Sequence, residues 1–161
     1  MRRITLVAAA LCVAAASAPL LADEDSQGFL RVVEGAATLI RVEDGQPEAA
    51  RENTPALAGD RLSLAPGSRV EVILPDGHRL RLAESADLEL VALARSLDED
   101  SAATALQLSN GALAIDVPLE AFDRTRVDTE AASVLLERGG LYLVEIDQRG
   151  STRVVVREGE A

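Results

Sequence analysis

The amino-acid sequence predicts an all-β fold of about eleven short strands, arranged as a two-layer β-sandwich or roll or as a short β-solenoid. Apolar and charged residues alternate with period two along short runs, most strictly in Arg79–Leu82. Clusters of Gly, Pro, Asp and Asn separate these runs at intervals of about ten residues. No stretch after the N-terminus keeps a helical period for more than about two turns. The pattern leaves the choice between sandwich and solenoid open.

The N-terminus has the layout of a secretory signal peptide. A basic start, Met1–Arg3, precedes the apolar run Ile4–Ala16, and Ala22 precedes an acidic run. We expect cleavage after Ala22; the alternative, an uncleaved anchor over Ile4–Ala22, is weakened by its alanine content and by Pro19. The predicted organisation is a signal peptide at 1–22, an acidic leader at 23–28 and a β-domain at 29–161, in a periplasmic or secreted protein.

Short turns separate the predicted strands. Pro75-Asp76-Gly77 is the sharpest hairpin signal, because proline presets φ, aspartate caps the turn and glycine accepts positive φ. Asn110-Gly111 is a second turn of this kind. The strands are expected at Phe29–Val33, Thr38–Val42, Arg61–Leu64, Arg69–Leu74, Arg79–Leu82, Asp87–Leu90, Thr104–Leu108, Ala112–Val117, Arg126–Thr129, Ser133–Glu137, Leu141–Ile146 and Arg153–Arg157.

Other stretches are predicted to connect the strands. Glu43–Pro55 is expected to be a polar loop, Asp98–Ser101 a solvated loop and Pro118–Asp123 a connector. Val91–Leu97 suits a helical turn as well as a strand, because it is rich in alanine and leucine.

Composition argues against several classes of partner. The chain has 27 acidic and 16 basic residues, and loss of residues 1–22 leaves 14 basic residues and a net charge of −13. Such a charge repels nucleic acid and anionic lipid. The aromatic side chains are only Phe29, Phe122 and Tyr142, so little stacking surface is available for sugars or bases.

The residues predict no catalytic, cofactor or metal site. His78 is the only histidine, it follows a turn, and we expect it to be solvated. The only cysteine, Cys12, lies in the signal peptide, so the usual zinc ligand sets and a disulfide are both excluded. Asp60 and Asp76 are interpreted as turn caps. We therefore expect a protein that is not an enzyme.

Three arginines alternate on neighbouring predicted strands, at positions 69, 79 and 81. They are expected either to form an exposed cationic stripe or to pair across strands with Glu71 and Glu89.

The order of motifs resembles the FecR domain, which is named after the ferric-citrate regulator. The matching residues are Gly35 with Arg41, Leu57-Ala58-Gly59-Asp60-Arg61-Leu62, Gly67-Ser68-Arg69-Val70-Glu71-Val72, Leu74-Pro75-Asp76-Gly77, Leu80–Leu82, Leu106–Leu113 with Gly111, Val127-Asp128-Thr129, Gly140–Val144 with Tyr142, and Val154–Gly159. Glu130 stands where members often have proline, and Leu141 where they often have threonine. A further strand often follows the final Glu-Gly, so the resemblance leaves the C-terminal edge undefined.

The resemblance implies structural roles for the motif and turn positions Gly35, Gly59, Asp60, Gly67, Asp76, Gly77, Gly111, Thr129, Gly140, Tyr142 and Gly159. Because only the predicted signal peptide precedes the β-domain, it also implies a stand-alone exported form rather than an anti-sigma factor. The expected function is a non-catalytic binding, signalling or scaffolding module of the bacterial envelope. Its partner would be an envelope protein, engaged by an edge strand or an acidic face. The alternative is a cell-wall or polysaccharide-binding domain.

Overall fold

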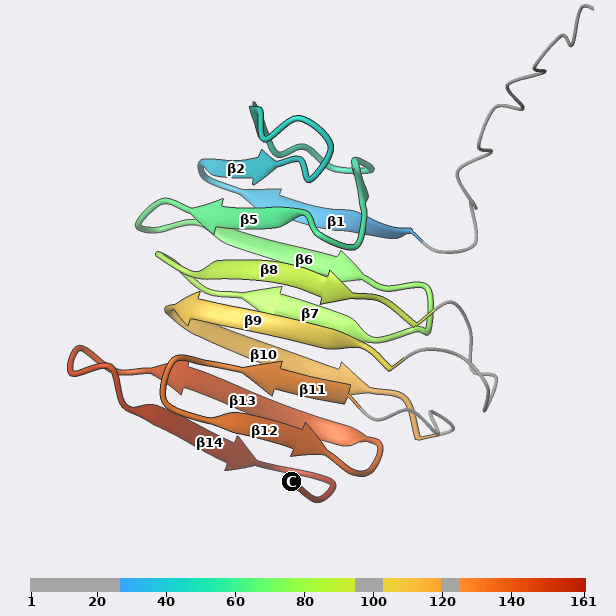
Figure 1. Ribbon diagram of the computed structural model, residues 1–161, viewed down its shortest axis with the longest axis vertical. Coiled ribbons are helices and arrows are strands. Elements are labelled where there is room, and N and C mark those ends of the chain that lie inside the picture. The colour runs from blue at the N-terminus through green and yellow to red at the C-terminus, as the bar shows by residue number, and fades with distance from the viewer. Residues whose placement is uncertain (1–26, 95–102, 120–124) are drawn as a thin grey trace, which may run out of the picture.

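Two β-sheets lie face to face in the computed structural model, which describes residues 27–94, 103–119 and 125–161. These residues form fourteen strands, seven in each sheet, and none of them is helical. The chain advances along the stack from β2 at one end to β14 at the other (Figure 1). The prediction of an all-β fold is confirmed, and the arrangement is the two-layer one. The predicted signal peptide and most of the acidic leader lie outside the described residues.

The first sheet contains the two longest strands, and only two of its six pairs, β6 with β7 and β13 with β14, join strands that are consecutive in the chain. Its order is β14 (Thr152–Val156), β13 (Gly140–Ile146), β10 (Ala112–Val117), β7 (Arg79–Leu82), β6 (Arg69–Ile73), β1 (Gly28–Glu34) and β4 (Pro55–Ala56). All of these pairs are antiparallel. Gly28, expected to end the acidic leader, is already the first residue of β1.

The second sheet packs against the first sheet, with the core between them. Its order is β12 (Ser133–Leu136), β11 (Thr125–Asp128), β9 (Ala105–Asn110), β8 (Asp87–Ala92), β5 (Arg61–Leu64), β2 (Ala37–Ile40) and β3 (Pro47–Ala49). Its pairs are antiparallel except for β9 with β11, which run parallel. Val91, for which a helical turn was the alternative, lies in β8, whereas residues 95–102 and 120–124 lie outside the described residues.

The chain crosses from one sheet to the other after every one or two strands. Strands β6 and β7 belong to the first sheet, strands β8 and β9 to the second, and strand β10 to the first again. Gly111 makes the crossing from β9 to β10 possible, because its φ is +80° and a Cβ there would lie 2.6 Å from Ala86 Cα. The Asn-Gly turn is thus a change of sheet, and not a simple hairpin.

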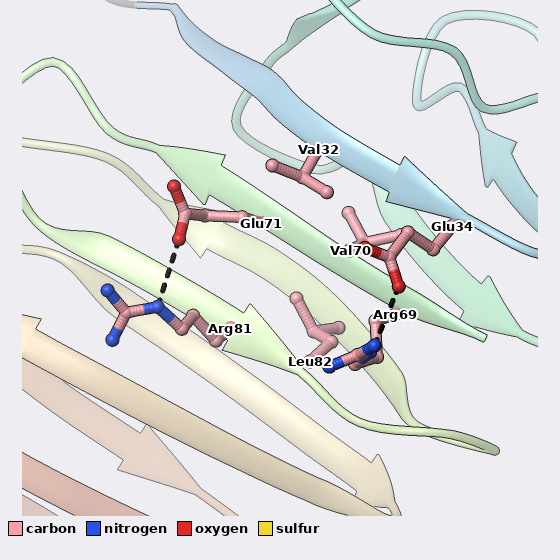
Figure 2. Close-up of a pocket in the computed structure, with 7 residues that line it drawn as sticks. All are labelled: Val32, Glu34, Arg69, Val70, Glu71, Arg81 and Leu82. Carbon is pink, nitrogen blue, oxygen red and sulfur yellow. Dashed lines mark hydrogen bonds and ion pairs between the residues drawn. The ribbon is translucent and has the colours of Figure 1, made fainter. Parts of the chain in front are cut away.

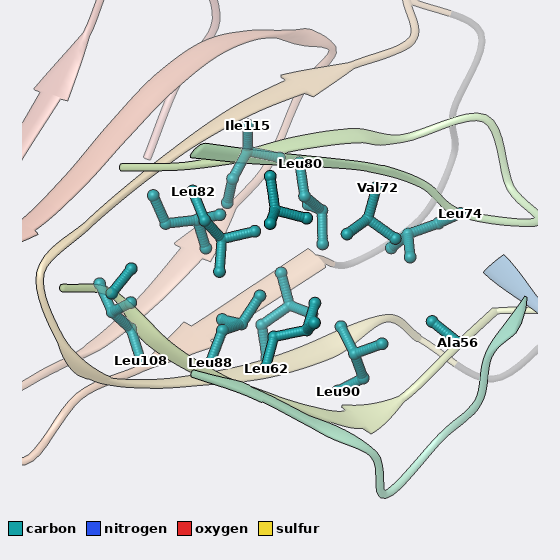
Figure 3. Packing of buried hydrophobic residues seen from close by; sticks show 14 of the residues in the cluster. Ala56, Leu62, Val72, Leu74, Leu80, Leu82, Leu88, Leu90, Leu108 and Ile115 are labelled. Atoms are coloured by element: carbon teal, nitrogen blue, oxygen red, sulfur yellow. The ribbon is translucent and has the colours of Figure 1, made fainter. Parts of the chain in front are cut away.

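The core lies between the sheets and is built mainly from leucine. Leu80, Leu82 and Ile115 of the first sheet face Leu62 and Leu88 of the second in two opposed rows (Figure 3). All five side chains are buried. Each such side chain contributes about 1.5–3 kcal/mol when it leaves water. The inward residues are those that period two predicts, so the core follows from the sequence pattern.

Two strands lie where a polar loop was predicted, so that prediction is wrong for part of Glu43–Pro55. β3 pairs with β2, and β4 pairs with β1. Both strands are short, start at a proline and lie at the edge of a sheet. Proline is confined to such edges because it has no N–H to donate to a neighbouring strand. The described residues contain no helix long and apolar enough to cross a bilayer.

Candidate functional site

The motif positions predicted from the sequence do not converge on one site. The glycines lie in the turns between strands or, for Gly140, at the start of a strand: Gly35 between β1 and β2, Gly59 before β5, Gly67 between β5 and β6, Gly77 between β6 and β7, Gly111 between β9 and β10, and Gly159 after β14. Thr129 directly follows β11, in the turn to β12. Its hydroxyl accepts a hydrogen bond from the Ala132 amide at 3.0 Å and contacts Thr152 Oγ1 at 2.6 Å. These positions shape the turns.

Asp60 organises the N-terminal end of the sandwich. Its buried carboxylate accepts hydrogen bonds from the Val42 amide at 3.0 Å, from the Leu57 amide at 3.0 Å and from Arg41 Nη1 at 2.9 Å. Arg41 also pairs with Glu48 of β3 at 2.6 Å. The carboxylate therefore ties the ends of three strands together. The interpretation of Asp60 as a cap agrees with these contacts.

His78 is fully buried, so the expectation of a solvated histidine is wrong. Its Nε2 lies 2.7 Å from Thr125 Oγ1, and its Nδ1 lies 2.8 Å from Asp76 Oδ1, although the angle at Nδ1 does not meet that of a hydrogen bond. Asp76 also accepts from Thr104 Oγ1 at 2.5 Å and from the His78 amide at 3.1 Å. We call Asp76, His78, Thr104 and Thr125 the buried polar cluster. It joins the β6–β7 turn of the first sheet to the starts of β9 and β11 in the second.

The order of groups in the buried polar cluster, a carboxylate, an imidazole and a hydroxyl, is also that of a hydrolytic triad. All four side chains are buried, however, so the Thr125 hydroxyl is not exposed at the surface. Burial by itself would raise the pKa of Asp76, but His78, with help from Thr104, outweighs burial and holds that pKa below its ordinary value. The carboxylate thus stays ionised in the core, where it stabilises the contact between the sheets.

The alternating arginines are paired rather than free. Arg81 pairs with Glu71 at 2.9 Å and Arg69 with Glu34 at 2.8 Å, so cross-strand pairing explains the stripe. The predicted pairing with Glu89 is wrong, because Glu89 lies on β8 in the other sheet. There it faces Arg61 of β5.

A shallow hollow of about 150 Å³ lies between these two ion pairs, on the outer face of the first sheet (Figure 2). Val32 borders it because Arg31 is an extra residue in β1, a β-bulge that turns Val32 outward opposite Glu71. Small-molecule sites usually measure about 300–1,000 Å³. The hollow is smaller, and both of its guanidinium groups already have carboxylate partners.

The C-terminal end of the sandwich is held by Tyr142. Its ring lies in the core, and its hydroxyl donates to the Arg138 carbonyl at 2.7 Å and accepts from the Glu160 amide at 2.9 Å. The Glu160 carbonyl in turn accepts from the Glu137 amide at 3.0 Å. Gly159 has a φ of +103°, and a Cβ there would collide with the Tyr142 hydroxyl. The C-terminal residues therefore bridge from β14 to the end of β12.

Strand β14 leaves apolar side chains in solvent. Val154 and Val156 lie opposite Val144 and Tyr142 of β13, both of which are buried, so they face the same side of the sheet as the core. Yet they are 38% and 42% exposed. In Figure 1, β14 is the last strand of the stack. No described strand pairs with its outer edge. We call β14 with Arg157 the C-terminal edge.

Among the described residues, no group of three or more His, Cys, Asp or Glu side chains is placed to hold a metal ion. The carboxylates of the fold instead bind arginines and backbone amides, as the pairs above show.

Comparison with curated proteins and with solved structures gives no match. The family model described as FecR protein matches residues 60–161, which is well over half of the chain. The match covers β5 to β14, and with them the buried polar cluster, Tyr142 and the C-terminal edge. The chain therefore belongs to the FecR family, whose domains are typically periplasmic and related to signalling.

Proposed function

We propose that this chain is a non-catalytic, protein-binding module of the bacterial envelope, which engages its partner through the C-terminal edge. The observation that carries the proposal is the exposure of Val154 and Val156 on a strand that lacks an outer neighbour among the described residues. Exposed strand edges pair readily with other chains, and folded proteins usually protect them. Extended segments of partner proteins commonly bind by adding a strand to such an edge.

The opposite end of the sandwich differs from the C-terminal edge. Its outer strands, β3 and β4, have three and two residues and begin with Pro47 and Pro55. Short strands and proline are the usual means of protecting an edge from further pairing. The C-terminal edge has five strand residues and no proline. The asymmetry favours one end of the molecule as the binding end.

Two other functions have less support from the geometry. A hydrolase would need access to the Thr125 hydroxyl, which is buried. A polysaccharide binder would need aromatic faces for stacking, but Tyr142 lies in the core and Phe29 is 43% exposed on β1.

Photo-crosslinking in cells that export the protein tests the proposal. A photoreactive phenylalanine analogue is placed at Val156 and, as a matched control, at Val91, which is 44% exposed on the interior strand β8. We expect ultraviolet light to produce a discrete adduct with an envelope protein from position 156 and not from position 91. No adduct at 156, or the same adducts from both positions, would contradict the proposal.

A further inference from the structure

We infer that the C-terminal edge accepts an extended segment of its partner with the pattern acidic–apolar–any–apolar–acidic. This inference rests on the proposed function and specifies the chemistry of the partner. The argument comes from the two faces of β14, which present different side chains to an incoming strand. Residues directly opposite each other in neighbouring strands share a face, so each position of β14 selects for the residue beside it.

The core-side face of the C-terminal edge selects apolar residues. Val154 and Val156 continue the rows of Val144 and Tyr142 from β13, but none of the described strands pairs with β14 on its outer side to cover them. Partly buried Val134 of β12 packs against the core from the opposite sheet. Apolar side chains beside Val154 and Val156 would extend the core by one more strand and remove both valines from water. These are the second and fourth positions of the pattern.

The outer face of the C-terminal edge selects carboxylates. Arg153 lies on the outer face of β14, and Arg157, the first residue after the strand, is exposed as well, although the protein as a whole carries a net charge of −11. Arg153 contacts Glu145 at 3.2 Å, yet its side chain remains 69% exposed. Within the described part of the chain, Arg157 has no carboxylate at ion-pair distance. An incoming strand with acidic residues at the first and fifth positions places one carboxylate beside each arginine. The pattern reads the same in both directions, so it fits a parallel or an antiparallel strand.

A second copy of this chain is a poorer occupant. Two copies that pair through β14 about a twofold axis must place outer residues beside outer residues. In the register centred on Val155, Arg153 of one copy lies opposite Arg157 of the other; in the register centred on Val154, the same arginines are diagonal neighbours. Like charges at these positions are destabilising. Two bodies of net charge −11 also repel each other.

Peptide binding to the purified protein tests the inference. The probe is a fluorescent peptide with the sequence SEVTVES, and its charge-reversed control is SKVTVKS; binding is followed by fluorescence anisotropy. We expect SEVTVES to bind about tenfold or more tightly than SKVTVKS, with an affinity that falls as salt is added, because the ion pairs are exposed. Two forms of SEVTVES, N-methylated at neighbouring residues, report on strand pairing. Only one of the two adjacent amides faces β14, so one form should lose binding and the other should keep it.

Protein variants locate the binding site. Val156→Lys is expected to reduce SEVTVES affinity at least about tenfold, whereas Val91→Lys, its matched control, leaves the affinity unchanged. Arg157→Glu should weaken SEVTVES and strengthen SKVTVKS, whereas Arg149→Glu in the exposed β13–β14 turn should change neither. Circular dichroism of each variant confirms that the fold is retained.

Absence of SEVTVES binding up to about 1 mM, or equal binding of both peptides, overturns the inference. If a crosslinked partner is nevertheless found at position 156, the proposed function stands and only the partner chemistry is wrong. Concentration-dependent dimerisation that Val156→Lys abolishes would also overturn the inference, in favour of a second copy of the chain. Loss of both the crosslink and the peptide signal would contradict the function and the inference together.

Discussion

Removing the carboxylate of the buried polar cluster should be among the most costly single substitutions in this protein. Asp76→Ala leaves two buried donors without their acceptor, the His78 amide and the Thr104 hydroxyl, and it also removes the 2.8 Å contact between Asp76 Oδ1 and His78 Nδ1. Each unsatisfied donor costs about 1–3 kcal/mol, and the threonine hydroxyl can rotate toward another acceptor. Because the two unsatisfied donors and the lost contact with His78 act together, we expect a loss of about 3–5 kcal/mol. For a chain of this size that lowers Tm by roughly 10–15 °C.

Asp76→Asn removes the negative charge of this side chain but nearly keeps its shape. Its carbonyl can still accept from the His78 amide while its amide donates to Thr104 Oγ1, so we expect a smaller loss of about 1–2 kcal/mol. Urea unfolding followed by circular dichroism measures all variants, with exposed Glu130→Ala as the control that changes stability by less than about 0.5 kcal/mol. A loss below about 1 kcal/mol for Asp76→Ala would refute the reasoning.

The pH dependence of unfolding gives the same reasoning a second test. The folded state lowers the pKa of Asp76. Its ionised form is therefore favoured in the native protein, and the resulting stabilisation is complete above the unfolded pKa of about 3.9. That stabilisation is lost as the pH falls through the lower, folded pKa. The difference in unfolding free energy between wild type and Asp76→Asn should narrow below about pH 4. Parallel pH profiles in this range would show that His78 does not stabilise the charge.

Three further substitutions probe the turns and the C-terminal end. Tyr142→Phe removes the hydroxyl that holds Glu160, and we expect a loss of about 1–2 kcal/mol in urea unfolding together with faster proteolysis of the C-terminal residues; unchanged proteolysis would argue against the bridge. Asp60→Ala deprives two amides and a guanidinium of their acceptor and should cost about 2–4 kcal/mol in the same assay, whereas a loss within error would mean that the cap is dispensable. Gly111→Ala should destabilise the protein by about 1–3 kcal/mol more than Gly45→Ala, because both glycines have positive φ but only Gly111 lies against another backbone; equal losses in thermal unfolding would exclude the steric contribution.

Local pattern was sufficient to locate most strands. Arg61–Leu64, Arg79–Leu82 and Ala112–Val117 have the bounds that alternation predicts, because a half-buried strand needs an apolar residue at every second position. Alternation did not predict β3 and β4. They are held by backbone hydrogen bonds at the edges of the sheets and by the contacts of Arg41, and neither needs an apolar alternation.

The functional features were harder to predict than the strands. The buried polar cluster joins residues separated by 28 and 47 positions, and nothing near His78 in the sequence indicates that Thr104 and Thr125 come to meet it. Val154 and Val156 have the alternation of any core strand, and their sequence pattern does not show whether another strand will cover them. The burial of a polar group and the exposure of an apolar group both depend on neighbours that are distant in the sequence.

By itself, the sequence of this FecR-family chain determined an all-β fold, its turn positions, its negative charge and a core without disulfides. Period two says which residues of one strand share a face, and that information is local. Only the tertiary structure decided which strands share a sheet, that Glu89 lies apart from the arginines of β6 and β7, that His78 enters the core, and that no described strand pairs with the outer edge of β14. Each of these outcomes depends on pairing between segments far apart in the chain, because a strand's environment is made by its neighbours in space.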